Sequence, residues 1–79
     1  MDAKAKYDQA FVESFSLSDP SVLAGLEYNA IQEWDSIGHM SLMAALEEAF
    51  GLTLETDDII EFNSYEKGKD ILKKYGVDI

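Results

Sequence analysis

The sequence contains no cysteine and a single histidine among its 79 residues. The absence of cysteine excludes disulfide bonds, thiolate zinc sites and a thiol nucleophile, and it agrees with a reducing compartment. One histidine cannot build a multi-histidine metal site. We therefore predict no catalytic residues and no resident metal.

Long hydrophobic runs are also missing. No apolar run approaches the roughly 20 residues that a membrane-spanning helix needs, and the start, Met1 to Lys4, resembles no export signal. We therefore expect a cytoplasmic protein without membrane insertion. A chain of 79 residues that is 47% apolar predicts one domain over residues 1–79, with a thin core and no deep catalytic cavity. We expect a monomer that is not an enzyme.

Positive charge is scarce. The chain has 16 acidic and 6 basic residues, a formal net charge of −10, and every basic residue is a lysine. The segment from Tyr7 to Glu66 contains no lysine and 13 acids. Such a field repels nucleic acid and anionic lipid and attracts proteins with basic patches. We expect protein partners of that kind and no nucleic acid; the alternative is that the acids serve only solubility.

The spacing of apolar residues predicts an all-α fold: a small antiparallel helix bundle of three main helices plus a short third helix, with a long first loop. Asp19 and Pro20 suit the start of a short turn, and Gly25 and Gly51 suit left-handed stops. The alternating segment 52–54 has no strand to pair with. The expected helical segments are Ala3–Phe15, Pro20–Ala24, Ser36–Phe50, one from Glu55 or Thr56, and one capped by Asn63 or Ser64.

The predicted helix Ser36–Phe50 carries two apolar stripes when its residues are placed at about 100° intervals. The core stripe consists of Leu42, Met43, Leu46, Ala49 and Phe50. The second stripe consists of Ile37, Met40 and Ala44, beside Ser36, Ser41, Glu47 and Glu48. A few apolar anchors inside an acidic rim are typical of a docking surface. The alternative is that this stripe packs beneath Ile31 or Trp34 of the preceding loop.

The start of this helix is unusual. Asp35 and Ser36 are ordinary N-cap residues, but a capping box would need Glu or Gln where Gly38 and His39 stand. Glycine in the first turn costs roughly 1 kcal/mol relative to alanine, which is easier to explain if something approaches the backbone closely beside Ser36. We expect His39 to be a neutral, hydrogen-bonded side chain at the core edge; the alternative is a contact with a partner.

Two segments carry a resemblance to a known family. Trp34–Met40 reads WDSIGHM and Ala44–Gly51 reads AALEEAFG, and together they resemble the acyl carrier protein family. In that family Asp-Ser-Leu or Asp-Ser-Ile begins the second helix, which ends in Glu-Glu-x-Phe. The resemblance extends from about Tyr7 to Tyr75 and includes the order of the helices.

The resemblance implies that Ser36 carries 4′-phosphopantetheine, attached from coenzyme A by a phosphopantetheinyl transferase. The thiol of this arm would hold acyl or aminoacyl groups as thioesters, which supplies the sulfur that the chain lacks. Partner enzymes of fatty-acid, polyketide or other acyl pathways would load and unload the arm. The family's docking positions match six residues here: Asp35, Ile37, Met40, Ala44, Glu47 and Glu48.

The sequence departs from the family pattern at three positions. Gly38 and His39 replace a polar or acidic pair, and Ser41 stands where an acid is common in fatty-acid carriers. These departures indicate a specialised carrier rather than one for bulk fatty-acid synthesis. A further glycine, Gly68, lies on the inner face of the last helix, where it predicts either close helix packing or room for an acyl chain.

Other classes of function remain as alternatives. The charge alone also suits an acidic protein-interaction module without a prosthetic group, such as an anion mimic. Phosphorylation of Ser36 as a regulatory switch would use the same hydroxyl. The acids Asp57, Asp58 and Glu61 lack the spacing of a calcium-binding loop, so we do not expect a calcium sensor.

Overall fold

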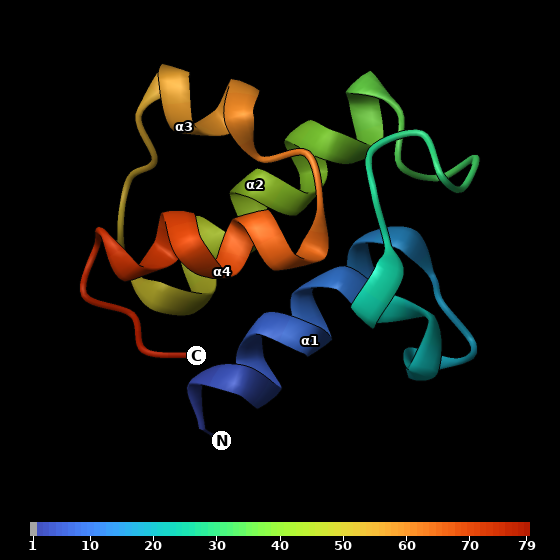
Figure 1. Cartoon of the computed structure of the whole chain (residues 1–79), viewed down its shortest axis with the longest axis horizontal. Coiled ribbons are helices and arrows are strands. Elements are labelled where there is room, and N and C mark those ends of the chain that lie inside the picture. The colour runs from blue at the N-terminus through green and yellow to red at the C-terminus, as the bar shows by residue number, and fades with distance from the viewer. Residues whose placement is uncertain (1) are drawn as a thin grey trace.

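The computed structural model describes residues 2–79, and within this range the chain is mostly helical and forms no strand (Figure 1). Its radius of gyration is 11.3 Å, close to the roughly 12 Å expected for a compact chain of this length. The all-α prediction is therefore confirmed. The elements are α1 (Ala3–Phe15), the 3₁₀ helix η1 (Pro20–Gly25), α2 (Ser36–Phe50), α3 (Thr56–Glu61) and α4 (Tyr65–Lys73).

The ends of the helices follow from local side-chain chemistry. Asp2 caps α1 by accepting a hydrogen bond from the Ala5 N–H at 2.7 Å, and Ser64 caps α4 by accepting from the Lys67 N–H at 3.0 Å. Gly51 ends α2 in the left-handed conformation, with φ of 63°, as predicted. Among the helices of residues 2–79, none combines the length and apolar character needed to cross a membrane.

The prediction that Gly25 ends its helical turn in the left-handed conformation is wrong. The next residue, Leu26, is extended, and Gly25 is not among the glycines with positive φ. The reason is that the chain continues straight into a short pairing with the segment before α4. The Tyr28 N–H donates to the Asn63 carbonyl and the Tyr65 N–H donates to the Leu26 carbonyl, both at 2.9 Å.

Aromatic side chains form the centre of the core. The ring of Phe11 in α1 lies within 5.3–6.2 Å of the rings of Trp34, Phe62 and Tyr65. Trp34 is fully buried although it belongs to the long loop, so this loop packs against the helices through its indole. From α2, Leu42, Met43 and Leu46 are buried, and Ala49 and Phe50 are half-buried.

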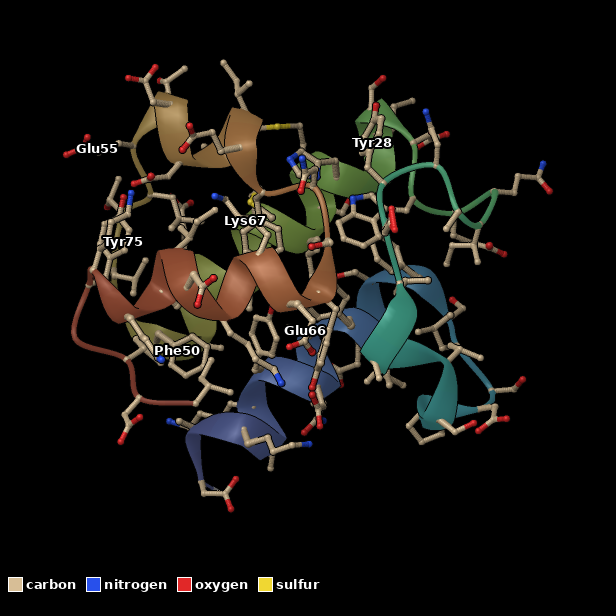
Figure 2. The ribbon with its side chains drawn as sticks, viewed as in Figure 1. Tyr28, Phe50, Glu55, Glu66, Lys67 and Tyr75 are labelled. Atoms are coloured by element: carbon tan, nitrogen blue, oxygen red, sulfur yellow. The ribbon has the colours of Figure 1, made fainter. Side chains whose placement is uncertain are left out.

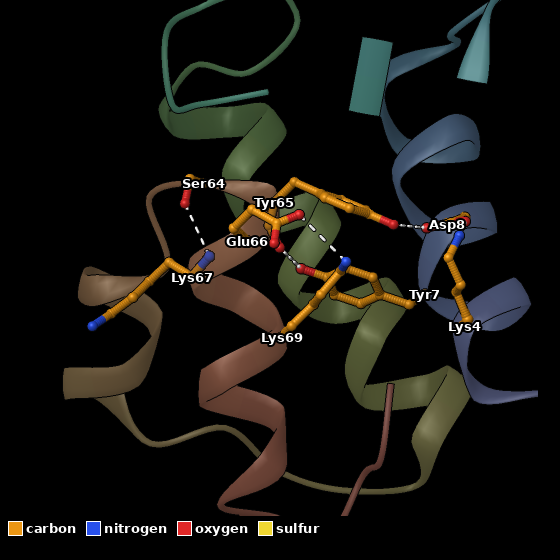
Figure 3. A network of polar contacts seen from close by, with 8 residues as sticks. All are labelled: Lys4, Tyr7, Asp8, Ser64, Tyr65, Glu66, Lys67 and Lys69. Carbon is orange, nitrogen blue, oxygen red and sulfur yellow. Dashed lines mark hydrogen bonds and ion pairs between the residues drawn. The ribbon is translucent and has the colours of Figure 1, made fainter. Parts of the chain in front are cut away.

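A polar network joins α1 to α4 (Figure 3). The Tyr7 hydroxyl donates to the Tyr65 carbonyl at 2.6 Å, and the Tyr65 hydroxyl donates to the Asp8 carboxylate. Burial raises the pKa of both tyrosines, so both hydroxyls keep their protons and act as donors. Lys4 completes the network with an ion pair to Asp8 at 2.7 Å.

Gly68 is the point of closest approach within this part of the core. A Cβ atom on Gly68 would lie 2.2 Å from the Tyr7 hydroxyl and 2.2 Å from Cζ of Phe62. The two side chains therefore occupy the space that a larger residue would need. Close packing explains this glycine, and the alternative of room for an acyl chain at Gly68 is wrong.

Asp58 attaches α3 to the end of α4. Its buried carboxylate accepts from Lys74 Nζ and from the Tyr75 hydroxyl, each at 2.5 Å. The Tyr75 hydroxyl also accepts from the Glu55 N–H at 3.0 Å, and Figure 2 shows Glu55 and Tyr75 together at one edge of the molecule. The hydrogen bonds from Lys74 and Tyr75 hold the pKa of Asp58 below its usual value.

Candidate functional site

Ser36 is the first residue of α2, and it is exposed. The helix begins here because the Asp35 carboxylate accepts a hydrogen bond from the Gly38 N–H at 2.8 Å, which satisfies one of the N–H groups left unpaired at a helix start. Asp35 caps the helix without the reciprocal glutamate of a capping box. The Asp35 carboxylate, and not the Ser36 hydroxyl, therefore caps the helix, and Ser36 is exposed at its start.

Gly38 is explained by the chain itself. A Cβ atom at this position would lie 1.9 Å from the carbonyl oxygen of Glu33, so the loop before α2 crosses directly over the first turn. The backbone is closely approached, as the sequence suggested. The approaching group is the Glu33 carbonyl of the preceding loop.

The second apolar stripe of α2 faces outward. Ile37 is 80% exposed and Met40 is 55% exposed, and Ala44 is exposed beside them. Neither Trp34, which is buried in the core, nor the rest of the loop covers this stripe. The alternative that it packs beneath the loop is therefore wrong. Ile37, Met40 and Ala44 form a continuous apolar strip that begins next to Ser36.

The acids beside this strip divide into two kinds. Glu48 is exposed. Glu47 is half-buried, and its carboxylate accepts a hydrogen bond from the Leu54 N–H at 2.8 Å, which fastens the segment between α2 and α3. Glu48 has the exposure that a docking residue needs, whereas Glu47 has a structural contact that the sequence did not reveal.

A groove of about 350 Å³ lies beside Ser36, between α2 and α3. Ile60 of α3 forms part of its rim and is 72% exposed. The groove extends the apolar strip of α2 onto α3. Exposed apolar side chains therefore lie along one side of Ser36. The lining residues are Tyr28, Ser36, His39, Met40, Ile59 and Ile60.

His39 forms the inner wall of the groove. Its Nδ1 accepts a hydrogen bond from Trp34 Nε1 at 2.9 Å, so in the neutral ring the proton is on Nε2, which donates to the Ile59 carbonyl at 2.7 Å. The side chain is buried. The prediction of a neutral, hydrogen-bonded histidine at the core edge is confirmed, and this ring joins the loop, α2 and α3.

Charge is separated along the fold. The lysines lie in α1, in α4 and at the end of α4, whereas α2 and α3 contain none. These two helices carry exposed acids instead, among them Glu48, Asp57 and Glu61. The face that carries Ser36 therefore presents a negative field, which favours partners with basic surfaces.

Three residues that line this groove, Tyr28, Ile59 and Ile60, were not identified from the sequence. Ile60 lies in a helix of six residues, which is too short for periodicity to show which side faces outward. Tyr28 lies in an irregular segment, and its hydroxyl is 3.4 Å from Ser36 Oγ. The neighbouring residue, Asn29, adopts a left-handed φ of 66°. Asparagine is one of the residues that tolerate this conformation, so its presence is a local sign of a turn.

The central features of the site are an exposed serine at the start of a long helix, an apolar strip with exposed acids beside it, and an adjoining groove. Comparisons of the chain with protein-family models, with curated proteins and with solved structures give no match.

Proposed function

We propose that this protein carries acyl or aminoacyl groups as thioesters on a 4′-phosphopantetheine arm attached to Ser36. The observation that carries the proposal is the exposed hydroxyl at the head of α2, next to an uncovered apolar strip and a groove. The same proposal includes the arrangement of the helices as a small antiparallel bundle of the acyl carrier type. The protein would act as a substrate of other enzymes and perform no bond chemistry itself.

The residues around Ser36 fit such a group. Ser36 is exposed and does not cap the helix. The N-terminal end of α2 favours a phosphate because the helix dipole is positive there. In the transfer, Ser36 Oγ attacks the β-phosphorus of coenzyme A and a P–O bond forms. The bond to the bridging oxygen breaks, adenosine 3′,5′-bisphosphate leaves, and the hydroxyl proton passes to a base of the transferase. When attached, the group supplies a thiol that forms thioesters.

The exposed face of α2 would bind the partner enzymes. Ile37, Met40 and Ala44 offer apolar anchors, and a few such anchors inside a charged rim suit a modest, reversible interface. Asp35 and Glu48 add negative charge that steers basic partners toward Ser36. We expect the partners to be a phosphopantetheinyl transferase and acyl-loading and acyl-transfer enzymes with basic patches.

Intact mass tests this proposal. The unmodified protein is incubated with coenzyme A and a phosphopantetheinyl transferase of broad specificity, and the expected result is a gain of one phosphopantetheine. Ser36→Ala should show no gain. Ser41→Ala is the matched control, because Ser41 is an exposed serine on the same helix, and this variant should be modified like the wild type.

A negative result would favour the other class of function. If the wild type gains no mass while a known carrier is modified in the same reaction, the carrier proposal is wrong. The acidic face would then be better explained as the contact surface of an interaction module without a prosthetic group. A gain that persists in Ser36→Ala would place the modification on another residue and contradict the assignment of Ser36.

A further inference from the structure

Tyr28 brings a second hydroxyl to Ser36. Its phenolic oxygen lies 3.4 Å from Ser36 Oγ, and the two residues line the same groove. Tyr28 is 37% exposed, so its side chain is only partly covered. Figure 2 shows Tyr28 beside the first turn of α2.

The position of Tyr28 does not depend on Ser36. Its N–H donates to the Asn63 carbonyl at 2.9 Å, and the next N–H, of Asn29, donates to the Trp34 carbonyl at 2.9 Å. Its ring meets the His39 ring edge to face at 5.6 Å and the Trp34 ring at 6.4 Å. Backbone and ring contacts therefore hold the hydroxyl at one place, which lowers the entropy cost of using it.

The hydroxyl is suited to an acceptor more strongly charged than a serine. A separation of 3.4 Å is long for two hydroxyl groups, which usually hydrogen-bond at about 2.7–2.8 Å, so the contact with unmodified Ser36 is weak. A phosphodiester on Ser36 would place negatively charged oxygens beside Tyr28. Hydrogen bonds to such oxygens are shorter and stronger than neutral ones.

The negative charge of Asp35 explains why a hydrogen-bond donor beside Ser36 would help to hold a phosphate there. Its carboxylate already accepts the Gly38 N–H at the start of α2, and it places a negative charge near any phosphate carried by Ser36. The helix end therefore cannot offer its full attraction to a second anion. Tyr28 approaches from the loop and supplies a neutral donor that is independent of the capping contact.

We propose that Tyr28 is a positioning residue for the group attached to Ser36: its hydroxyl donates a hydrogen bond to the phosphodiester and holds the beginning of the arm at the groove between α2 and α3. This inference rests on the proposed function. It assigns to the loop before α2 a direct part in orienting the arm.

The test uses Tyr28→Phe, which removes the hydroxyl and keeps the ring that packs against Trp34 and His39. When Tyr28→Phe carries the group on Ser36, we expect its ³¹P resonance to be shifted relative to the modified wild type. We also expect the NMR signals of the arm to be narrower, because the arm is held less firmly. The kcat/KM for modification should fall about fivefold, the size expected for one exposed hydrogen bond. Tyr75→Phe is the matched control, because it removes a tyrosine hydroxyl that contacts Asp58 instead of Ser36, and it should leave the ³¹P resonance unchanged.

A second measurement needs no variant. In the wild type, the ¹³Cζ resonance of Tyr28 should move on modification, and that of Tyr75 should not. If the wild type is modified but neither the Tyr28 resonance nor the ³¹P resonance of Tyr28→Phe changes, Tyr28 has no positioning role and the carrier proposal stands. If the wild type is not modified at all, both proposals are overturned.

Discussion

The indole of Trp34 donates its N–H to Nδ1 of His39 across 2.9 Å in a buried hydrogen bond. The other nitrogen of the same ring reaches the Ile59 carbonyl at 2.7 Å. One buried imidazole thus connects the loop before α2, the first turns of α2 and the end of α3. These three segments are the walls of the groove beside Ser36, so the shape of the candidate site depends on this ring.

Replacing His39 by leucine should lower the free energy of unfolding by about 2–4 kcal/mol, because it leaves the Trp34 N–H and the Ile59 carbonyl without partners. Urea unfolding followed by circular dichroism measures this loss. In a Trp34→Phe background the same change should cost less, since the indole donor is already absent. An equal cost in both backgrounds would show that the hydrogen bond to Trp34 does not contribute.

Gly38→Ala should destabilise the protein, although alanine is favoured over glycine in an exposed helix by about 1 kcal/mol. The new methyl group would lie 1.9 Å from the Glu33 carbonyl, and the loop would have to move. Overpacking of this kind costs about 1–3 kcal/mol, so after the gain from alanine we expect a net loss of up to about 2 kcal/mol in urea unfolding. A gain in stability would contradict the close approach of Glu33.

Regular periodicity made much of the fold predictable. The bounds of α2 follow from its cap and its glycine stop, and the 3.6-residue repeat shows that the helix has a second apolar stripe. Whether this stripe faces outward or packs beneath the loop was left open by the repeat and is decided by the exposure of Ile37 and Met40. The contacts that shape the site depend instead on where irregular segments lie. The Glu33 carbonyl next to Gly38 and the Tyr28 hydroxyl beside Ser36 both belong to the loop before α2. Because this loop has no periodic pattern of apolar residues, its path could not be predicted from the sequence.

The contacts of the polar side chains were also only partly predictable from the sequence. Glu47 and Glu48 are adjacent acids that the sequence does not distinguish. In the structure, Glu47 accepts a hydrogen bond from the Leu54 N–H, whereas Glu48 is exposed. In the sequence, Asp58 is one of two adjacent acids at the start of a short helix, where the helix dipole favours negative charge. Its contacts with Lys74 and Tyr75 join residues 16 and 17 positions apart, which local patterns cannot indicate.

Asp58→Asn should remove a stabilising contact that depends on pH. The folded protein holds the pKa of Asp58 below its usual 3.8, so the charged carboxylate stabilises the fold above the unfolded pKa, and this contribution disappears as the pH falls through the lower folded pKa. The difference in melting temperature between wild type and Asp58→Asn should be largest near neutral pH and shrink below about pH 4. The control is Asp57→Asn, an exposed neighbour, which should not reproduce this pattern.

Gly68→Ala should destabilise the junction of α1 and α4. The added methyl group would meet the Tyr7 hydroxyl and Phe62 at 2.2 Å, and moving Tyr7 would break its hydrogen bond to the Tyr65 carbonyl. We expect a loss of about 1–3 kcal/mol in the free energy of unfolding. Gly25→Ala provides the comparison, since a Cβ there meets no atom within 4 Å; an equal effect at both positions would contradict the packing argument.

Glu48→Lys should slow modification of Ser36 without lowering stability. Glu48 is exposed on the face of α2 that we propose binds partners, so reversing its charge weakens the attraction of a basic enzyme. We expect kcat/KM to fall about three- to tenfold at low ionic strength, and the loss to shrink as salt screens the charges. Glu47→Lys serves as the contrast, because that residue also fastens the Leu54 N–H and its replacement should lower the melting temperature as well. A loss in Glu48→Lys that does not change with salt, at unchanged stability, would rule out long-range steering and restrict this residue to a direct contact.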